Sequence, residues 1–558
     1  MEDIFVFIII GSVSYILLLM SMSNIKFLST FSITLIVFSP AILSAQIDTA
    51  WIIIEPWTIS NGIVSDMAID NAGNVYVTGG TVVNYTGLDY VTVKYYTNGV
   101  GAWYDAYNGP GNTGDLARAL TVDDLGNVYV TGKSNSYTYS EYTTIKYNSG
   151  GTRTWVKRYT ESVNDGAYAI EVDSSGYVFV TGSGQSLIGE NLDYTTIKYD
   201  LNGDTAWVIK YNGPGNSNDY SKALVLDDPG NVFVTGYSRG SGSDDDYTTI
   251  KYYPNGDTAW VRRYNGSGNG PDQATSLAID SLGNLYVTGY SMGSDSSYYI
   301  TTIKYNSNGD TLWMRMFSEP LNNYAYALVV DNSANVYIAG SCQGSVNDSL
   351  DYITVKYYPN GDTAWVRIYD GPGSQTDAAS SIALDDLGNV YVTGRSFGSV
   401  TDLDFATIKY DPNGNSCWVV RYNGPGNGID KAKDIAIDHS GNVYVTGESM
   451  DVDSLLHYAT IKYIQSINIK ETKLMQMSLN LQPEILPNPA RNYFTIRTQP
   501  HTEHFIIKIF DISGKKIKEV DCVNLSLENR IPLTDINQGV YFVQVDNDIT
   551  PRKIVIIE

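Results

Sequence analysis

The heptapeptide Gly73-Asn74-Val75-Tyr76-Val77-Thr78-Gly79 returns in close copies along most of the chain. The seven further copies begin at Gly126, Gly176, Gly230, Gly283, Ala334, Gly388 and Gly441. Successive copies start 50 to 54 residues apart, which is far more regular than chance composition would produce. A period in this range is typical of repeat proteins, whose units bury their hydrophobic faces against their neighbours. The chain is therefore expected to fold as eight similar units.

Every unit contains four short segments with the character of β-strands. In the fourth unit these are residues 207–211, 223–227, 231–235 and 248–252. Branched and aromatic residues alternate with polar ones, and Gly and Asn separate the segments, which is the pattern of strands and tight turns. Four such strands per unit are typical of a propeller blade. The sequence thus predicts an all-β, eight-bladed β-propeller of four-stranded blades, with a seven-bladed ring plus a stray unit as the alternative.

The order of the strands predicts how the ring closes. Residues 435–437 and their relatives are small and apolar, which suits the crowded axis, so the strand that carries Trp is outermost. The eighth unit, which ends at Tyr463, then lacks an outer strand, while residues 48–54 have no unit of their own. We expect these two segments to pair, because this pairing removes an open sheet edge and ties the ends of the ring together.

The first 45 residues contain two apolar runs, 4–20 and 27–43. The second run resembles a signal peptide, with Lys26 before it and the small-residue cleavage site Ser44-Ala45-Gln46 after it. The first run opens with two acidic residues, which do not suit a signal, so we expect translation to start near Met20 or Met22. A two-span membrane hairpin is the alternative, although both runs are short for crossing a bilayer. Residues 1–45 are thus interpreted as a signal peptide with an upstream mis-start, and residues 46–463 as the propeller.

The periodicity stops after Tyr463. Residues 464–485 are mainly polar and are expected to be a linker. Three segments of residues 486–558 alternate apolar and polar residues between turns. This pattern predicts a small antiparallel β-sandwich.

Two resemblances follow from these motifs. The pattern Asp-x-x-Gly-Asn-Val-Tyr-Val-Thr-Gly, followed by Thr-Thr-Ile-Lys-Tyr, resembles the bacterial β-propeller repeat called SBBP. That family implies a propeller, mostly in exported proteins, and no common activity. Residues 486–558 resemble the type A C-terminal sorting domain of the type IX secretion system, through Pro487-Asn488-Pro489, the Asp511 to Gly514 turn and Gly539-Val540-Tyr541. This second resemblance implies the secretion machinery as a partner, and release from, or attachment to, the surface of a gram-negative bacterium.

Composition and missing motifs exclude several functions. The formal charge of −24 argues against binding a phosphate backbone, which needs clustered Lys and Arg, so no nucleic-acid partner is expected. Four histidines at unrelated positions do not form a zinc ligand set. No nucleophile elbow or other nucleophile setting is expected, although Gly-x-Ser-x-Gly spacing occurs within three of the repeated units, at 236–240, 289–293 and 394–398. An enzymatic propeller needs unlike polar residues that converge on its channel, and the units read as nearly uniform.

Acidic residues precede the innermost strand in six of the eight units: Asp115, Asp165, Asp219, Asp272, Asp377 and Asp430. The strand directions place them on the same face as the long variable loops, one of which carries Asp244, Asp245 and Asp246. These nine residues are the candidate binding residues. Oxygen-rich clusters suit Ca²⁺, but no loop has EF-hand spacing. A solvated acidic rim that caps backbone groups, without a cofactor, is the simpler interpretation.

The sequence therefore predicts a secreted or surface-attached propeller that binds a glycan or a protein through its loop-rich face. We expect it to be monomeric and not to be an enzyme. The alternative is a hydrolase or lyase that acts on a polysaccharide, with carboxylates at the channel mouth as acid and base. That chemistry requires two carboxyl groups about 5 to 9 Å apart.

Overall fold

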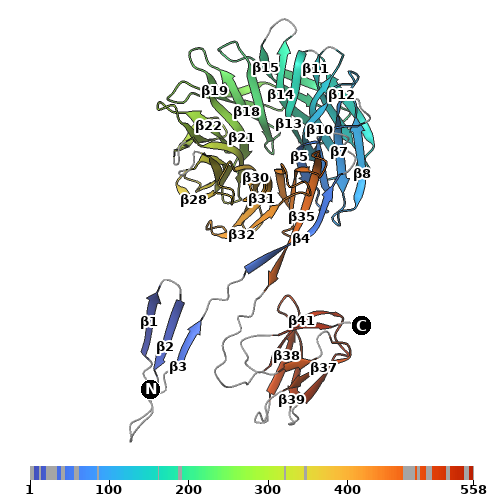
Figure 1. The fold of residues 1–558 in the computed structure, drawn as a ribbon, viewed down its shortest axis with the longest axis vertical. Coiled ribbons are helices and arrows are strands. Elements are labelled where there is room, and N and C mark those ends of the chain that lie inside the picture. Colours follow the sequence, from blue (N-terminus) through green and yellow to red (C-terminus); the bar gives the residue numbers. More distant parts are fainter. Residues whose placement is uncertain are drawn as a thin grey trace. The chain divides into compact units, whose positions relative to one another are not determined.

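A computed structural model gives the fold (Figure 1). It describes residues 5–11, 14–20, 34–38, 44–55, 62–83, 87–137, 139–160, 162–186, 191–318, 322–344, 349–468, 484–486, 490–497, 505–522, 528–545 and 552–556. These residues divide into two compact units. One unit comprises Ile42–Ile469, and the other comprises Met1–Ala41 together with Lys470–Glu558.

The first unit contains eight four-stranded antiparallel sheets, as the repeats predict. Each sheet is one blade, and its strands follow from the innermost to the outermost. Blades 1 to 4 consist of β5 (Ile63–Ile69), β6 (Val75–Val82), β7 (Leu88–Tyr95) and β8 (Gly101–Tyr107); β9 (Leu116–Val122), β10 (Val128–Asn135), β11 (Ser140–Tyr147) and β12 (Arg153–Tyr159); β13 (Ser162–Val172), β14 (Val178–Ser186), β15 (Leu192–Tyr199) and β16 (Thr205–Tyr211); and β17 (Asp219–Leu226), β18 (Val232–Arg239), β19 (Asp245–Tyr252) and β20 (Thr258–Tyr264).

Blades 5 to 8 repeat this order. They consist of β21 (Asp272–Ile279), β22 (Leu285–Met292), β23 (Tyr298–Tyr305) and β24 (Thr311–Phe317); β25 (Tyr324–Val330), β26 (Val336–Gln343), β27 (Leu350–Tyr357) and β28 (Thr363–Tyr369); β29 (Ala378–Leu384), β30 (Val390–Phe397), β31 (Leu403–Tyr410) and β32 (Ser416–Tyr422); and β33 (Lys431–Ile437), β34 (Val443–Met450), β35 (Leu456–Asn468) and β4 (Ser44–Ile54). The prediction of an eight-bladed, all-β propeller is confirmed.

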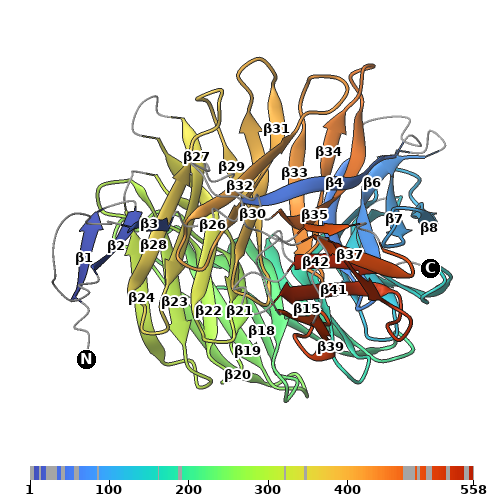
Figure 2. The ribbon, with the colours of Figure 1, turned by 90° about the horizontal axis from the view of Figure 1, so that it is seen from below.

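Blade 8 closes the ring with a strand from the other end of the chain. Strand β4 pairs antiparallel with β35, from Ile54 opposite Ala459 to Ser44 opposite Asn468. Figures 1 and 2 both draw β4, in blue, beside the orange β35. On the inner side, β33 of blade 8 contacts β5 of blade 1. The predicted pairing of the orphan N-terminal segment with the eighth unit is therefore confirmed.

Neighbouring blades are joined by contacts that repeat around the ring. The Tyr247 hydroxyl of blade 4 donates a hydrogen bond to the Thr301 carbonyl of blade 5 (3.1 Å). The Trp260 indole N–H donates to the Ser307 carbonyl (3.2 Å), in the turn between β23 and β24. Because the same residues recur in most units, each blade offers its neighbour the same surface, and the repeated sequence produces a repeated interface.

The C-terminal part of the second unit is a two-sheet sandwich. One sheet has the order β36 (Glu484–Leu486), β37 (Tyr493–Arg497) and β40 (Glu528–Pro532). The other has the order β39 (Lys516–Cys522), β38 (Phe505–Phe510), β41 (Gly539–Val545) and β42 (Arg552–Ile556). Both sheets contribute to one apolar core, which includes Phe494, Ile531, Ile507, Val543 and Ile554.

The N-terminal segments β1 (Phe5–Gly11), β2 (Ser14–Met20) and β3 (Thr34–Phe38) form a three-stranded antiparallel sheet. Side chains before Ile47 lie outside the described part of the chain, so the signal peptide stays a prediction. Among the described residues, no helix is long and apolar enough to cross a membrane. The linker prediction falls mostly on residues 469–483, which are outside the described ranges, whereas β35 continues to Asn468.

Candidate functional site

The acidic residues before the innermost strands lie at the loop-rich ends of the blades. The Asn135 main-chain N–H, at the end of β10, donates a hydrogen bond to Asp115 Oδ1 (2.9 Å), just before β9. The loop between the second and third strands therefore lies beside the start of the innermost strand. This is the shared face that the strand directions predict.

The carboxylates of this acidic set hold the backbone of the blades together. Asp115 has no exposed surface, and its other oxygen, Oδ2, accepts a hydrogen bond from the Gly109 N–H (2.7 Å). Asp219, Asp272, Asp377 and Asp430 are equally buried and accept the equivalent pair of main-chain N–H groups. The side chain of Asp165 lies outside the described residues. These carboxylates serve the loop backbone, and ligand binding by them stays a prediction.

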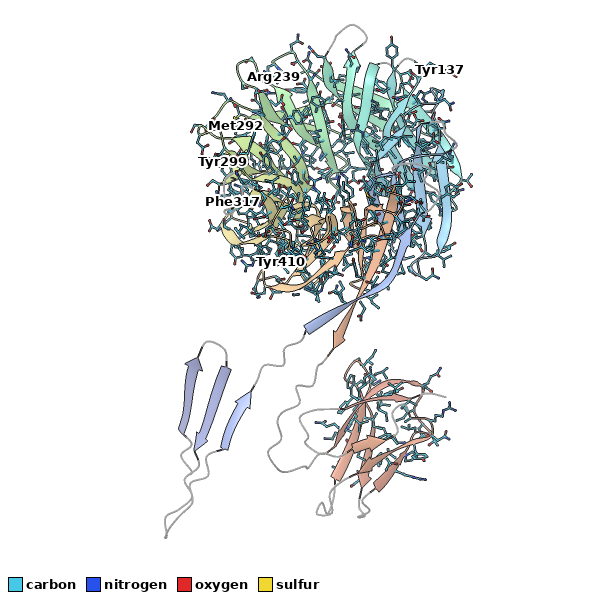
Figure 3. The ribbon with its side chains drawn as sticks, viewed as in Figure 1. Tyr137, Arg239, Met292, Tyr299, Phe317 and Tyr410 are labelled. Carbon is cyan, nitrogen blue, oxygen red and sulfur yellow. The ribbon has the colours of Figure 1, made fainter. Side chains whose placement is uncertain are left out.

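The three acidic residues of the blade 4 loop also have partners within the protein. Asp244 forms an ion pair with Arg239, which Figure 3 labels, and Asp246 forms one with Arg263 (2.7 Å). Asp245 accepts a hydrogen bond from the Gln273 amide (3.1 Å). Ligand binding by these three residues stays a prediction as well.

A different set of side chains lies around the channel mouth, at a β-bulge in each innermost strand. Each innermost strand shifts its register against the second strand at the same place, which leaves one extra residue there. The extra residues, called the bulge residues below, are Ser65, Arg118, Tyr168, Lys222, Thr275, Tyr326, Ser380 and Lys433. They include three cations and two tyrosines, so the expectation of uniform units is wrong at this position.

The bulge residues can be identified in the sequence by their position in the repeat. Each bulge residue stands five positions before the Asp that closes the innermost strand, as Arg118 does before Asp123 and Lys433 before Asp438. Alignment of the eight units on that Asp shows a column without a consensus inside an otherwise repeated strand. A bulge is a common device for redirecting a side chain next to a binding site.

Six of the eight bulge residues, all except Lys222 and Thr275, line a cavity of about 680 Å³ at the loop-rich mouth of the channel. Its charged lining residues are Arg118, Arg395, Lys431, Lys433 and Glu448, which are four cations and one anion. Tyr168 and Tyr326 add aromatic surface. The cavity is therefore locally basic in a chain whose net charge is −24.

Two cations lie over the ring of Tyr168, which lines this cavity. The Arg118 guanidinium lies 4.3 Å from the centre of the Tyr168 ring, and Lys222 Nζ lies 4.8 Å from the same centre. Burial lowers the pKa of Lys222, and the charge of Arg118 lowers it further. Burial raises the pKa of Glu448, against the opposing effects of Lys431 and Lys433.

Two carboxylates next to the bulges join the first and last blades. Asp434 Oδ2 accepts a hydrogen bond from the Met67 N–H (3.1 Å), and Asp66 Oδ2 accepts one from the Leu120 N–H (2.7 Å). Ser381 Oγ donates to Asp434 Oδ1 (2.7 Å). Burial, and then the charge of Asp434, raise the pKa of Asp66 well above its ordinary value. The fold thus favours protonated Asp66, and the two carboxylates link blades 7, 8, 1 and 2.

We expect Asp66→Asn to flatten the pH dependence of stability. A raised folded-state pKa means that the fold prefers protonated Asp66, so stability decreases as pH rises from the unfolded-state pKa, about 4, to the folded-state value. Each unit of that shift corresponds to about 1.4 kcal/mol, which the neutral amide removes at neutral and alkaline pH. Melting temperatures between pH 4 and pH 9 measure this effect. Asp386→Asn, at an exposed turn, is the control, and equal slopes in native protein and Asp66→Asn would contradict a raised pKa of Asp66.

Two family models match parts of this chain. A model described as a secretion system C-terminal sorting domain matches residues 484–558. A model described as a β-propeller repeat, SBBP, matches residues 111–139, 259–295, 364–399 and 418–450. The chain carries SBBP β-propeller repeats and a type IX C-terminal sorting domain. The sorting domain implies interaction of this SBBP protein with the type IX secretion machinery, and secretion or attachment at the cell surface.

One curated relative of this SBBP protein is an uncharacterized WD repeat-containing protein of Acanthamoeba polyphaga mimivirus. It is 23% identical over 366 residues, which cover 54% of this chain and 25% of the relative. The chain thus spans about a quarter of the length of the relative that it matches.

Solved structures with a similar fold share little sequence with the SBBP protein. An inactive variant of virginiamycin B lyase from Staphylococcus aureus is 11% identical, with coverage of 75% of this chain and 100% of that chain and a TM-score of 0.35. A polysaccharide lyase is 9% identical, with coverage of 75% and 99% and a TM-score of 0.38. At these sequence identities and TM-scores, the similar structures do not indicate what this chain binds.

Proposed function

We propose that this chain is a secreted or surface-attached propeller that binds an acidic glycan in the cavity at its channel mouth. The observation that supports the proposal is the lining of that cavity, where cations and tyrosines gather in an otherwise acidic chain. A cavity of about 680 Å³ falls within the usual size range of ligand sites, about 300 to 1,000 Å³.

The lining residues suit a carboxylated or sulfated sugar unit. Arg118 and Arg395 offer planar forks of N–H donors that match a carboxylate or a sulfate, and Lys431 and Lys433 add point charges. The rings of Tyr168 and Tyr326 offer flat apolar surface with a hydroxyl at one end. The net charge of −24 disfavours a long polyanion along the outer surface, so we infer a short or terminal acidic unit that enters the mouth.

The enzymatic alternative requires two carboxyl groups that face one pocket. Among the described residues that line the cavity, Glu448 is the one carboxyl group. Asp66 and Asp434 are close to each other, but their oxygens accept hydrogen bonds from the backbone and from Ser381. Binding without turnover is therefore better supported, and hydrolysis or elimination remains an outcome of the experiment below.

We expect calorimetric titration to show binding of a carboxylated or a sulfated oligosaccharide and none of a neutral one of equal length. Loss of one charge-assisted hydrogen bond costs about 1.5 to 3 kcal/mol, so Arg118→Ala and Lys433→Ala should each weaken binding about tenfold or more. Added salt should weaken binding further, because it screens the charges. Lys157→Ala is the matched control, since Lys157 lies on β12 outside the cavity lining and pairs with Asp204.

Three results would count against the proposal. Neutral and acidic oligosaccharides could bind equally, the two cavity variants could bind like native protein, or no oligosaccharide could bind a correctly folded chain. New reducing ends or unsaturated products in the same mixtures would instead support the hydrolase or lyase alternative.

A further inference from the structure

Blades 4 and 7 show how the propeller neutralises a buried carboxylate near its loop-rich face. In blade 4, Asp246 of β19 pairs with Arg263 of β20, at 2.7 Å between Oδ2 and Nη2. In blade 7, Asp404 of β31 pairs with Arg421 of β32 in the same way, at 2.8 Å. The arginine comes from the outermost strand in both blades, opposite Thr248 or Ala406.

Blade 6 keeps the carboxylate and lacks the arginine. Its acidic residue is Asp351 of β27, and the position of the arginine in β28 is occupied by Ile368, opposite Ile353. Two positions further on, where blades 4 and 7 have Asn265 and Asn423, blade 6 has Asp370. One cation is therefore lost and one anion gained relative to the other two blades.

The substitutions place two carboxylates of blade 6 beside Asp377, which precedes the first strand of blade 7. One ligand oxygen from each of Asp351, Asp370 and Asp377 lies within 4.8 Å of the others. Asp377 is fully buried and Asp351 is 7% exposed, whereas Asp370 is exposed and leaves the cluster open to solvent. The cluster is assembled from β27, from the residue after β28 and from the residue before β29.

Among the residues that the structure describes, Asp351 has no partner that neutralises its charge. Its Oδ1 is buried and forms no hydrogen bond with any of them. The equivalent Oδ1 atoms of Asp246 and Asp404 are also buried without a partner, but their Oδ2 atoms face an arginine. A buried carboxylate next to two others is costly unless a cation compensates it.

We propose that Asp351, Asp370 and Asp377 form a binding site for a divalent cation, with Ca²⁺ as the preferred ion. The donors are all carboxylate oxygens, which suit hard cations such as Ca²⁺, Mg²⁺ and Mn²⁺. Ca²⁺ accepts irregular geometry and a coordination number of six to eight, so three carboxylates and water can complete its shell, whereas Mg²⁺ demands a near-ideal octahedron. Blade 6 would then use a metal ion for the role that an arginine has in blades 4 and 7.

The test is calorimetric titration of CaCl₂ into the full mature chain after removal of metal with EDTA. We expect one site with a dissociation constant of about 0.1 to 1 mM, the range of extracellular modules, and a melting temperature that rises with Ca²⁺ concentration. Asp370→Asn, which restores the residue type of blades 4 and 7, should weaken binding at least tenfold. Ile368→Arg should abolish binding and raise the melting temperature in EDTA, because it supplies the missing cation.

The controls separate this site from general screening of the acidic surface. Asp386→Asn removes an exposed charge elsewhere and should bind Ca²⁺ like native protein. Circular dichroism confirms that each variant is folded. No Ca²⁺ binding to the native chain, or equal binding to native protein, Asp370→Asn and Ile368→Arg, would overturn the proposal. Binding of Zn²⁺ without binding of Ca²⁺ would also overturn it, in favour of a thiolate site that uses Cys342 opposite Asp351.

Discussion

Removal of residues 44–54 should lower the melting temperature by at least about 10 °C and cause the propeller to associate through its open edge. Strand β4 is the outermost strand of blade 8, and its loss leaves one edge of β35 unpaired. Trp51 of β4 also reaches blade 1, where its indole N–H donates a hydrogen bond to the Thr97 carbonyl (3.1 Å). The deletion therefore removes a strand ladder, several partly buried apolar side chains, each worth less than the about 1.5 to 3 kcal/mol of a fully buried one, and a link between the two ends of the ring.

Thermal unfolding and size-exclusion chromatography of chains that begin at residue 44 or at residue 55 measure this effect. A synthetic peptide of residues 44–54, added to the shorter chain, should restore most of the lost stability. The same peptide with Trp51→Ala should restore less, because it lacks the indole that reaches blade 1. A shorter chain that melts at the native temperature and stays monomeric would show that the ring closes without β4.

Trp260→Ala should reduce the free energy of unfolding by about 3 to 5 kcal/mol, as expected for removal of a large buried aromatic side chain. The indole is 9% exposed and lies between Phe233 and Tyr305, with ring centres 6.0 and 6.1 Å away. It covers Gly309, in the turn of the next blade, where φ is +81° and an added Cβ would lie 2.8 Å from the indole. Gly309→Ala should therefore destabilise the protein through backbone strain and through displacement of Trp260.

Gly283 supplies the matched control for the glycine substitution. It lies in the same blade at φ +78°, but an added Cβ would meet no atom within 4 Å. Gly283→Ala should therefore cost only the backbone strain, about 1 to 2 kcal/mol. Denaturant unfolding of both variants gives the contribution of the contact between Trp260 and Gly309 as their difference. Equal losses in the two variants would show that this contact adds nothing to the interface between the blades.

Much of the architecture could be predicted from the sequence, because it depends on what every unit shares. Alternation of apolar and polar residues marks the strands, and the repeated turns set their order. The eight copies of the heptapeptide then give eight blades, and the missing outer strand of the eighth unit identifies residues 48–54 as the orphan strand. The pairing of Trp51 opposite Lys462 follows from this reasoning and is present in the structure. The shared loop-rich face is predictable for the same reason, since strand direction alternates within each blade.

The candidate sites depend instead on the positions at which the units differ. Only the tertiary structure shows which of these residues lie close together. The bulges bring Arg118, Tyr168 and Lys433 from separate blades to one channel mouth, although the sequence spreads them over several repeats. The acidic residues that precede the innermost strands recur in most units, but their carboxylates accept hydrogen bonds from main-chain N–H groups of the neighbouring loops. Asp351, Asp370 and Asp377 become a cluster only because two segments of blade 6 and the start of blade 7 meet at one end. A periodic sequence determines its repeated backbone because local patterns suffice for strands and turns, whereas a binding site needs distances between segments that the period does not encode.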